Sequence, residues 1–153
     1  MSETSYPDEL ARAVGLVVIY AAWAEDGAGE LIGLHHGVNE PIRHRDWAAS
    51  GQQLCNGLAA VTYRELAHRL ERALDRRNHV VHGVFLWQRD ASVGLTMKRR
   101  RGLSDPAGFE MVSWSVTALN ALVSEFQIIR ELIDQEISRF MGIPSPAQPL
   151  NAD

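Results

Sequence analysis

The sequence DRRNHVVHGVF, from Asp75 to Phe85, marks the point where a helical pattern ends and a different pattern begins. Up to the end of the helical pattern, apolar residues recur at the spacing of an amphipathic helix. These residues are Leu66, Leu70, Ala73, Leu74 and Val81. At about 100° per residue, Arg77 lies in the middle of this apolar stripe, and Asn78 and His82 flank it on one side. Because a buried guanidinium group is costly unless it is paired, Arg77 is expected to have a partner.

Gly83 separates the helix from a segment of another kind. The stretch VFLWQRDASVGLTMKRRR places apolar and aromatic residues on both sides of the turn-like RDASVG, which predicts a small β-hairpin or an ordered loop. The basic run Lys98, Arg99, Arg100 and Arg101 closes this segment, and GLSDPAG then reads as a further loop. A basic run of this kind is either a solvated turn or a surface for an RNA backbone.

Helical patterns also occupy both sides of this region. One begins near Pro7 and Asp8, and its apolar stripe contains Glu25. A short helix is expected from Asp46 to about Ala60, and Thr62 with Glu65 forms a capping-box pattern that predicts the start of the helix carrying Arg77. The last helix is expected from about Phe109 to Met141, with Arg130 in its apolar stripe.

These elements predict an all-α fold, an up-and-down bundle of about four helices with one small excursion after Gly83. A single helical domain is expected over residues 8–141, because 153 residues are enough for one hydrophobic core. Residues 1–7 and the proline-containing tail 142–153 are expected to be flexible.

Composition limits the protein class. The chain has one cysteine, Cys55, so no internal disulfide and no cysteine-rich zinc site can form, and a reducing cytoplasmic compartment is expected. The most apolar run, LARAVGLVVIYAAWA, is too short to span a membrane. The adjacent histidines His35 and His36 lack the spaced acidic partners of a metal site, and no metal or cofactor is expected.

Charge is distributed unevenly along the chain. The net charge is −4, from 15 Lys and Arg against 19 Asp and Glu, which argues against a general nucleic-acid-binding protein. From Thr62 to Arg101, however, ten basic residues face four acidic ones, a local balance of +6, and the rest of the chain carries −10. A basic middle segment on an acidic body predicts a localised anion site.

The stretch RNHVVH, Arg77 to His82, resembles the R-x4-6-H motif of the HEPN superfamily, in which a polar residue often follows the arginine as Asn78 does here. The helical setting is similar as well, with the motif near the end of an inner helix and a long helix after it. The resemblance covers residues 8–141 in architecture and residues 77–83 in motif. Two residues after the histidine, where the toxin branch paired with nucleotidyltransferase antitoxins has a tyrosine, this chain has Val84.

The resemblance implies metal-independent cleavage of RNA by a homodimer, with a role as a toxin or as a defence or stress effector, and with an antitoxin or other protein as a further partner. In this chemistry His82 would be the acid or base, and Arg77 would bind the phosphate. Asn78 would orient either the His82 imidazole or the phosphate. The alternative from the same resemblance is a non-catalytic dimer that binds RNA, nucleotide or a protein partner.

A purely structural interpretation of the same residues also stays open. Arg77 would then pair with an acid in the core such as Glu25, and His82 would cap the helix end. Glu25 and Arg130, which lie in apolar stripes of different helices, could instead form an ion pair inside the bundle. His79 projects away from Arg77 and is expected to be a surface histidine.

Overall fold

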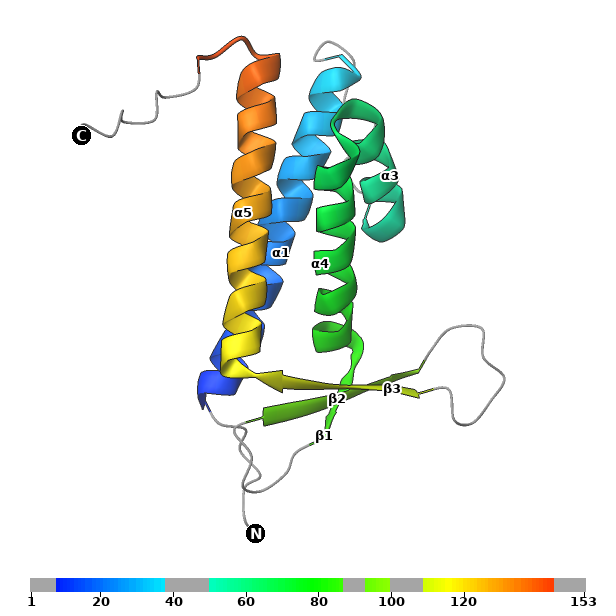
Figure 1. The fold of residues 1–153 in the computed structure, drawn as a ribbon, viewed down its shortest axis with the longest axis vertical. Helices are drawn as coiled ribbons and strands as arrows, with labels where there is room; N and C mark the ends of the chain where they lie inside the picture. The colour runs from blue at the N-terminus through cyan, green and yellow to red at the C-terminus, as the bar shows by residue number, and fades with distance from the viewer. Residues whose placement is uncertain (1–7, 38–49, 87–92, 100–108, 145–153) are drawn as a thin grey trace, which may run out of the picture.

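The computed structural model describes residues 8–37, 50–86, 93–99 and 109–144. Within these residues the helices are α1 (Asp8–His35), α3 (Gly51–Val61), α4 (Arg64–His82) and α5 (Val116–Phe140), labelled as in Figure 1. The strands are β1 (Val84–Leu86), β2 (Val93–Arg99) and β3 (Phe109–Ser115). Among the described residues, none of the helices combines the length and the apolar composition that a membrane span requires.

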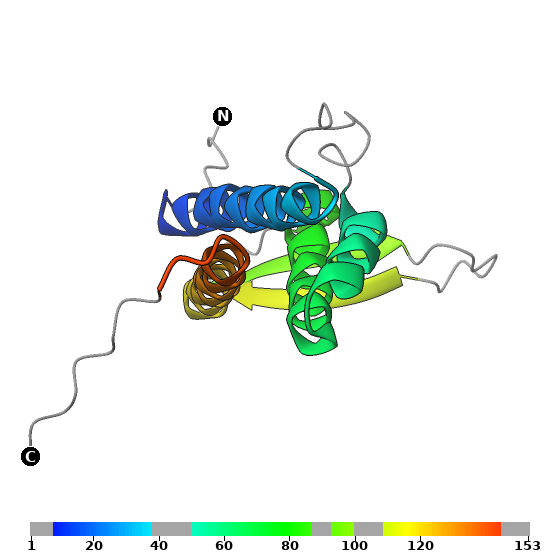
Figure 2. The ribbon, with the colours of Figure 1, turned by 90° about the horizontal axis from the view of Figure 1, so that it is seen from above.

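The helices form a bundle, which confirms the predicted helical-bundle fold. α1 and α5 run in the same direction, α4 runs opposite to them, and the shorter α3 packs against α4 and α1 (Figures 1 and 2). The helices share one hydrophobic core, whose largest fully buried side chains include Phe126, Ile129, Leu31, Leu58 and Leu70. Burial of these side chains is the main favourable term in folding, at about 25 cal/mol per Å² of apolar surface.

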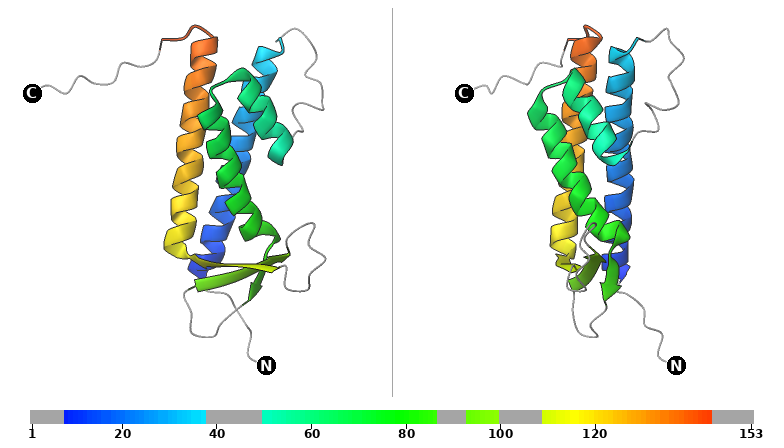
Figure 3. Two further views of the ribbon diagram at one scale, coloured as in Figure 1. Left: turned by 45° about the vertical axis from the view of Figure 1, so that its right-hand side comes forward. Right: turned by 90° about the vertical axis from the view of Figure 1, so that its right-hand side faces the viewer.

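A three-stranded antiparallel sheet crosses the end of the bundle where α4 finishes and α5 begins (Figures 1 and 3). The strand order is β1-β2-β3, with Val84 opposite Met97 and Thr96 opposite Val112. Thr96 is fully buried, and its hydroxyl accepts a hydrogen bond from Trp114 Nε1 at 2.9 Å and donates one to the Val112 carbonyl at 3.2 Å. These bonds hold the two longer strands together on the side that carries Trp114.

The third strand corrects the expected boundary of the last helix. Residues Phe109–Ser115 form β3, and the helix begins only at Val116, where the Ser115 hydroxyl accepts a hydrogen bond from the Ala118 amide at 3.0 Å. In FEMVSWS the apolar residues also alternate, so Val112 fits the helical stripe and the strand pattern equally well. Pairing with β2 decides between the two, because all seven residues align with β2 and alternate residues exchange backbone hydrogen bonds with it.

The expected capping box at Thr62 and Glu65 is also wrong. α4 begins at Arg64 with Tyr63 as its N-cap, and no side chain caps that end. The Thr62 hydroxyl instead donates to Glu136 Oε2 on α5 at 3.0 Å, while its amide closes the end of α3. Thr62 therefore ties the α3–α4 turn to α5.

The expected short helix is α3, which begins at Gly51 within the described residues, while 46–49 lie outside them. The flexibility expected for residues 1–7 and for most of 142–153 also falls on residues that the structure does not describe.

Candidate functional site at the end of helix α4

The motif residues occupy the last two turns of α4, and the sheet determines how this helix ends. Gly83 follows His82 directly, and its amide donates to the His79 carbonyl at 3.1 Å. A Cβ atom at Gly83 would lie 2.4 Å from that carbonyl oxygen and 2.7 Å from Thr96 Cβ. Only glycine therefore permits β2 to pack this closely against the helix end, directly after His82.

Arg77 points into the bundle and contacts α1. Its Nη2 donates to both carboxylate oxygens of Glu25, at 3.0 and 2.9 Å. The two side chains are only 18% and 20% exposed, so the pair is largely removed from water. Arg77 Nε is buried without a hydrogen-bond partner among the described residues. The expected partner of Arg77 in the core is therefore Glu25, as the structural interpretation of the sequence proposed.

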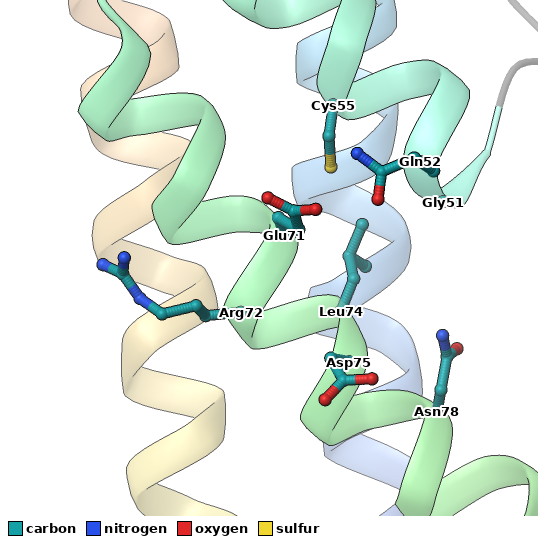
Figure 4. A pocket seen from close by; sticks show the side chains of 8 residues that line it. All are labelled: Gly51, Gln52, Cys55, Glu71, Arg72, Leu74, Asp75 and Asn78. Carbon is teal, nitrogen blue, oxygen red and sulfur yellow. The ribbon is translucent and has the colours of Figure 1, made fainter. Parts of the chain in front are cut away.

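Asn78 lines a pocket of about 450 Å³ between α3 and α4 (Figure 4). The pocket is lined by residues of both helices: Gly51, Gln52, Cys55, Glu71, Arg72, Leu74, Asp75 and Asn78. Burial and the nearby carboxylates of Glu71 and Glu25 raise the pKa of the Cys55 thiol to about 11. The lining thus carries two carboxylates and one guanidinium, a balance that disfavours a phosphate group there.

His82 is the last residue of α4 and is exposed to solvent. It makes no hydrogen bond or ion pair within the described part of the chain, so its imidazole is accessible to a ligand. His82 lies four residues after Asn78, which places both side chains on one side of the helix. Of the three residues in the predicted site, His82 and Asn78 therefore share a face, while Arg77 turns inward.

His79 is buried, with 7% of its surface exposed, so the expectation of a surface histidine was wrong. Its Nε2 lies 3.4 Å from Glu110 Oε2 on β3, and its Nδ1 is buried without a partner among the described residues. The sheet covers this side of α4, as the Arg76 guanidinium over the Trp114 ring at 5.7 Å also shows.

The proposed ion pair between Glu25 and Arg130 does not form. Glu25 bonds to Arg77, and Arg130 lies beside Asp26, Glu30 and Asp134, at 3.8, 3.7 and 2.9 Å. Neighbouring residues on a helix point about 100° apart, so Glu25 turns toward α4 and Asp26 toward α5. Each of the two predicted ion-pair residues is paired, but with other partners.

The basic run is described only in part. Lys98 and Arg99 lie in β2 opposite Glu110 and Phe109. The structure does not describe their side chains, and Arg100 and Arg101 lie outside the described residues. Across the residues that are described, no three or more His, Cys, Asp and Glu side chains group in a way that could hold a metal ion.

Comparisons of the chain with models of protein families, with curated proteins and with solved structures gave no match. The resemblance to the HEPN superfamily therefore stands on residues 77–83 and on their helical setting. The structure adds the geometry of that motif: an arginine held inside the bundle and a histidine exposed at the helix end, five residues apart.

Proposed function

We propose that this protein is a metal-independent endoribonuclease that works as a homodimer in the cytoplasm, with His82 as its acid–base residue. The observation that carries the proposal is the exposed position of His82 on the last turn of α4, directly before a glycine that the sheet fixes in place. A catalytic imidazole has to be reachable by the substrate and yet held on a rigid element.

The reaction has two proton transfers. The 2′-oxygen of RNA attacks the adjacent phosphorus, the bond from phosphorus to the 5′-oxygen breaks, and the products are a 2′,3′-cyclic phosphate and a 5′-hydroxyl. A base removes the proton of the 2′-hydroxyl, and an acid donates a proton to the leaving 5′-oxygen. Imidazole can perform either step near neutral pH. One chain supplies one His82, and a two-fold dimer supplies the pair.

In this proposal Asn78 and Arg77 have different roles. Asn78 lies on the His82 side of the helix and orients the imidazole or the phosphate. Arg77 Nη2 is taken by Glu25, and its Nε is buried. Arg77 is therefore a positioning residue that joins α4 to α1, and not the free phosphate-binding group that the motif alone would predict.

A non-catalytic dimer is the second candidate, and one observation favours it. The pocket beside Asn78 carries Glu71 and Asp75, which repel a phosphate group approaching from that side. A protein partner with basic side chains would suit this lining better than RNA does. The two candidates differ in whether purified protein cleaves RNA.

The test uses a fluorescent single-stranded RNA and purified protein in excess chelator. We expect cleavage in the chelator, products that end in a 2′,3′-cyclic phosphate, and no cleavage of an oligonucleotide with the same bases but no 2′-hydroxyl groups. Intact RNA after long incubation, or cleavage that stops in the chelator, would remove the nuclease proposal and leave the binding protein.

A further inference from the structure

The outer side of α1 carries a continuous exposed apolar face. Its members lie at helical spacing over about three turns, and all are exposed: Ala11, Gly15, Val18, Ile19, Ala22 and Trp23. The three large side chains Val18, Ile19 and Trp23 are 45%, 49% and 57% exposed. We call these six residues the α1 outer face. They lie opposite the buried side of α1, which includes Val17, Ala21 and Ala28.

A small residue and a large residue lie at equal distances on either side of the centre of this face. Ile19 stands at its centre, Gly15 lies four residues before it and Trp23 four residues after it. At 1.5 Å per residue, Gly15 and Trp23 are each about 6 Å from Ile19 along the helix. No atom lies within 4 Å of the place that a Cβ at Gly15 would occupy. The space above Gly15 is therefore open in the described chain.

Charges at the ends of the face follow the same symmetry. Arg12 lies seven residues before Ile19 and Asp26 seven residues after it, and both are exposed. Arg12 makes no hydrogen bond or ion pair with the described residues. Asp26 remains 62% exposed, with Arg130 at 3.8 Å as its neighbour. Basic and acidic groups thus lie at equal distances from one central residue.

We propose that the α1 outer face binds a second copy of this chain, with the two α1 helices antiparallel and Ile19 at the two-fold axis. In this arrangement Trp23 of each copy comes level with Gly15 of the other, and Arg12 comes level with Asp26. A parallel arrangement would instead place like charges together, Arg12 against Arg12 and Asp26 against Asp26. The charge pattern therefore favours the antiparallel dimer.

One pair in this arrangement is unfavourable. Asp8 would come level with Glu30 of the other copy, about 16 Å from the axis along the helix. Packed helices usually cross at an angle, so their ends diverge at this distance. Glu30 also has Arg130 beside it at 3.7 Å. The opposite charges of Arg12 and Asp26, which lie nearer the axis, dominate the pairing.

The α1 outer face lies opposite the side of α1 on which α4 packs through Arg77 and Glu25. A dimer through this face does not bring two His82 residues together, so the inference goes beyond the proposed function and is independent of it. Its test uses no RNA. Ile19→Cys places a thiol at the axis, where two copies can form a disulfide, and Ile128→Cys on α5 is the matched control at a position of similar exposure. Cys55 is buried and its thiol pKa is raised, so it does not compete. Under mild oxidation we expect Ile19→Cys to cross-link at least ten times faster than Ile128→Cys.

Charge exchange tests the orientation of the two helices. By sedimentation at micromolar concentration, Arg12→Glu and Asp26→Arg should each lower the dimer fraction, and the double variant Arg12→Glu with Asp26→Arg should restore it. A monomeric wild-type protein would overturn the inference. A dimeric mass with equal cross-linking of both cysteine variants would also overturn it, because the dimer would then use another face, while the proposed nuclease would be unaffected.

Discussion

Arg77 on α4 bonds through one nitrogen, Nη2, to both carboxylate oxygens of Glu25 on α1, and about four-fifths of each side chain is withdrawn from solvent. This pair connects the helix that carries the motif to the first helix of the bundle. It changes the interpretation of the arginine, because Nη2, one of the nitrogens that would bind phosphate, already bonds to Glu25.

Removal of Arg77 should therefore destabilise the protein. Arg77→Ala leaves Glu25 partly buried without its partner, a change that costs on the order of 3 kcal/mol. For a chain of this size the melting temperature should fall by roughly 10 °C. Thermal unfolding followed by circular dichroism measures this difference.

The double variant Arg77→Ala with Glu25→Ala is the control for that experiment. Because it removes both charges together, it should lose less stability than the sum of the two single variants. If the losses of stability of the two single variants add up to that of the double variant, the pair contributes nothing to the fold. An Arg77→Ala protein that melts at the wild-type temperature would show the same.

Gly83 should tolerate no side chain. In Gly83→Ala the new Cβ meets the His79 carbonyl and Thr96 at 2.4 and 2.7 Å, so the sheet has to move away from α4. Overpacking of this kind costs typically 1–3 kcal/mol. Chemical denaturation measures the loss, and Gly33→Ala is the matched control, because the corresponding site on α1 has nothing within 4 Å. Equal stability of the two variants would contradict the described contact.

Protonation of Glu125 should account for part of the stability that the fold loses in acid. Arg69 donates to it from Nε and Nη2, the second bond being 2.9 Å, and these hydrogen bonds lower the pKa of Glu125 below its ordinary value of 4.5. A lowered pKa in the folded state stabilises the fold above pH 4.5, and this stabilisation is lost as the pH falls through the folded-state value.

Glu125→Gln should consequently be less stable than wild type at neutral pH, with a difference that shrinks on acidification below about pH 4.5. Urea unfolding at a series of pH values measures the difference. Glu131→Gln, at an exposed position on the same helix, should show no such convergence. A difference in the free energy of unfolding between Glu125→Gln and wild type that grows in acid would contradict this assignment.

The helical pattern was sufficient to predict the bundle, because the apolar stripes of α1, α4 and α5 repeat over many turns. It was not sufficient for Phe109–Ser115, because Val112 satisfies a helical and an alternating pattern at once. Only the presence of β2 as a hydrogen-bonding neighbour decides that these residues form a strand. Pairing between distant segments is not encoded in the local spacing.

The same reason explains the errors at the site. His79 points away from the bundle core, so the periodicity of α4 alone places it on the surface, and the sheet that covers it comes from residues far along the chain. Arg77 was recognisable as a residue needing a partner, since it interrupts an apolar stripe. The choice between Glu25 and an external anion required the relative rotation of α1 and α4, which the sequence pattern does not specify.

In the proposed reaction His82 performs proton transfer, and a comparison of two histidine variants on one helix tests this role. His68 on α4 is exposed like His82 but lies more than three turns away, beside Glu71 at 3.3 Å. The cleavage rate of an RNA substrate is measured in excess chelator for wild type, His82→Ala and His68→Ala, with a melting curve for each. We expect a folded His82→Ala protein whose cleavage rate is at least about 100-fold lower, and an unchanged rate for His68→Ala. A folded His82→Ala protein that cleaves at the wild-type rate would contradict this role.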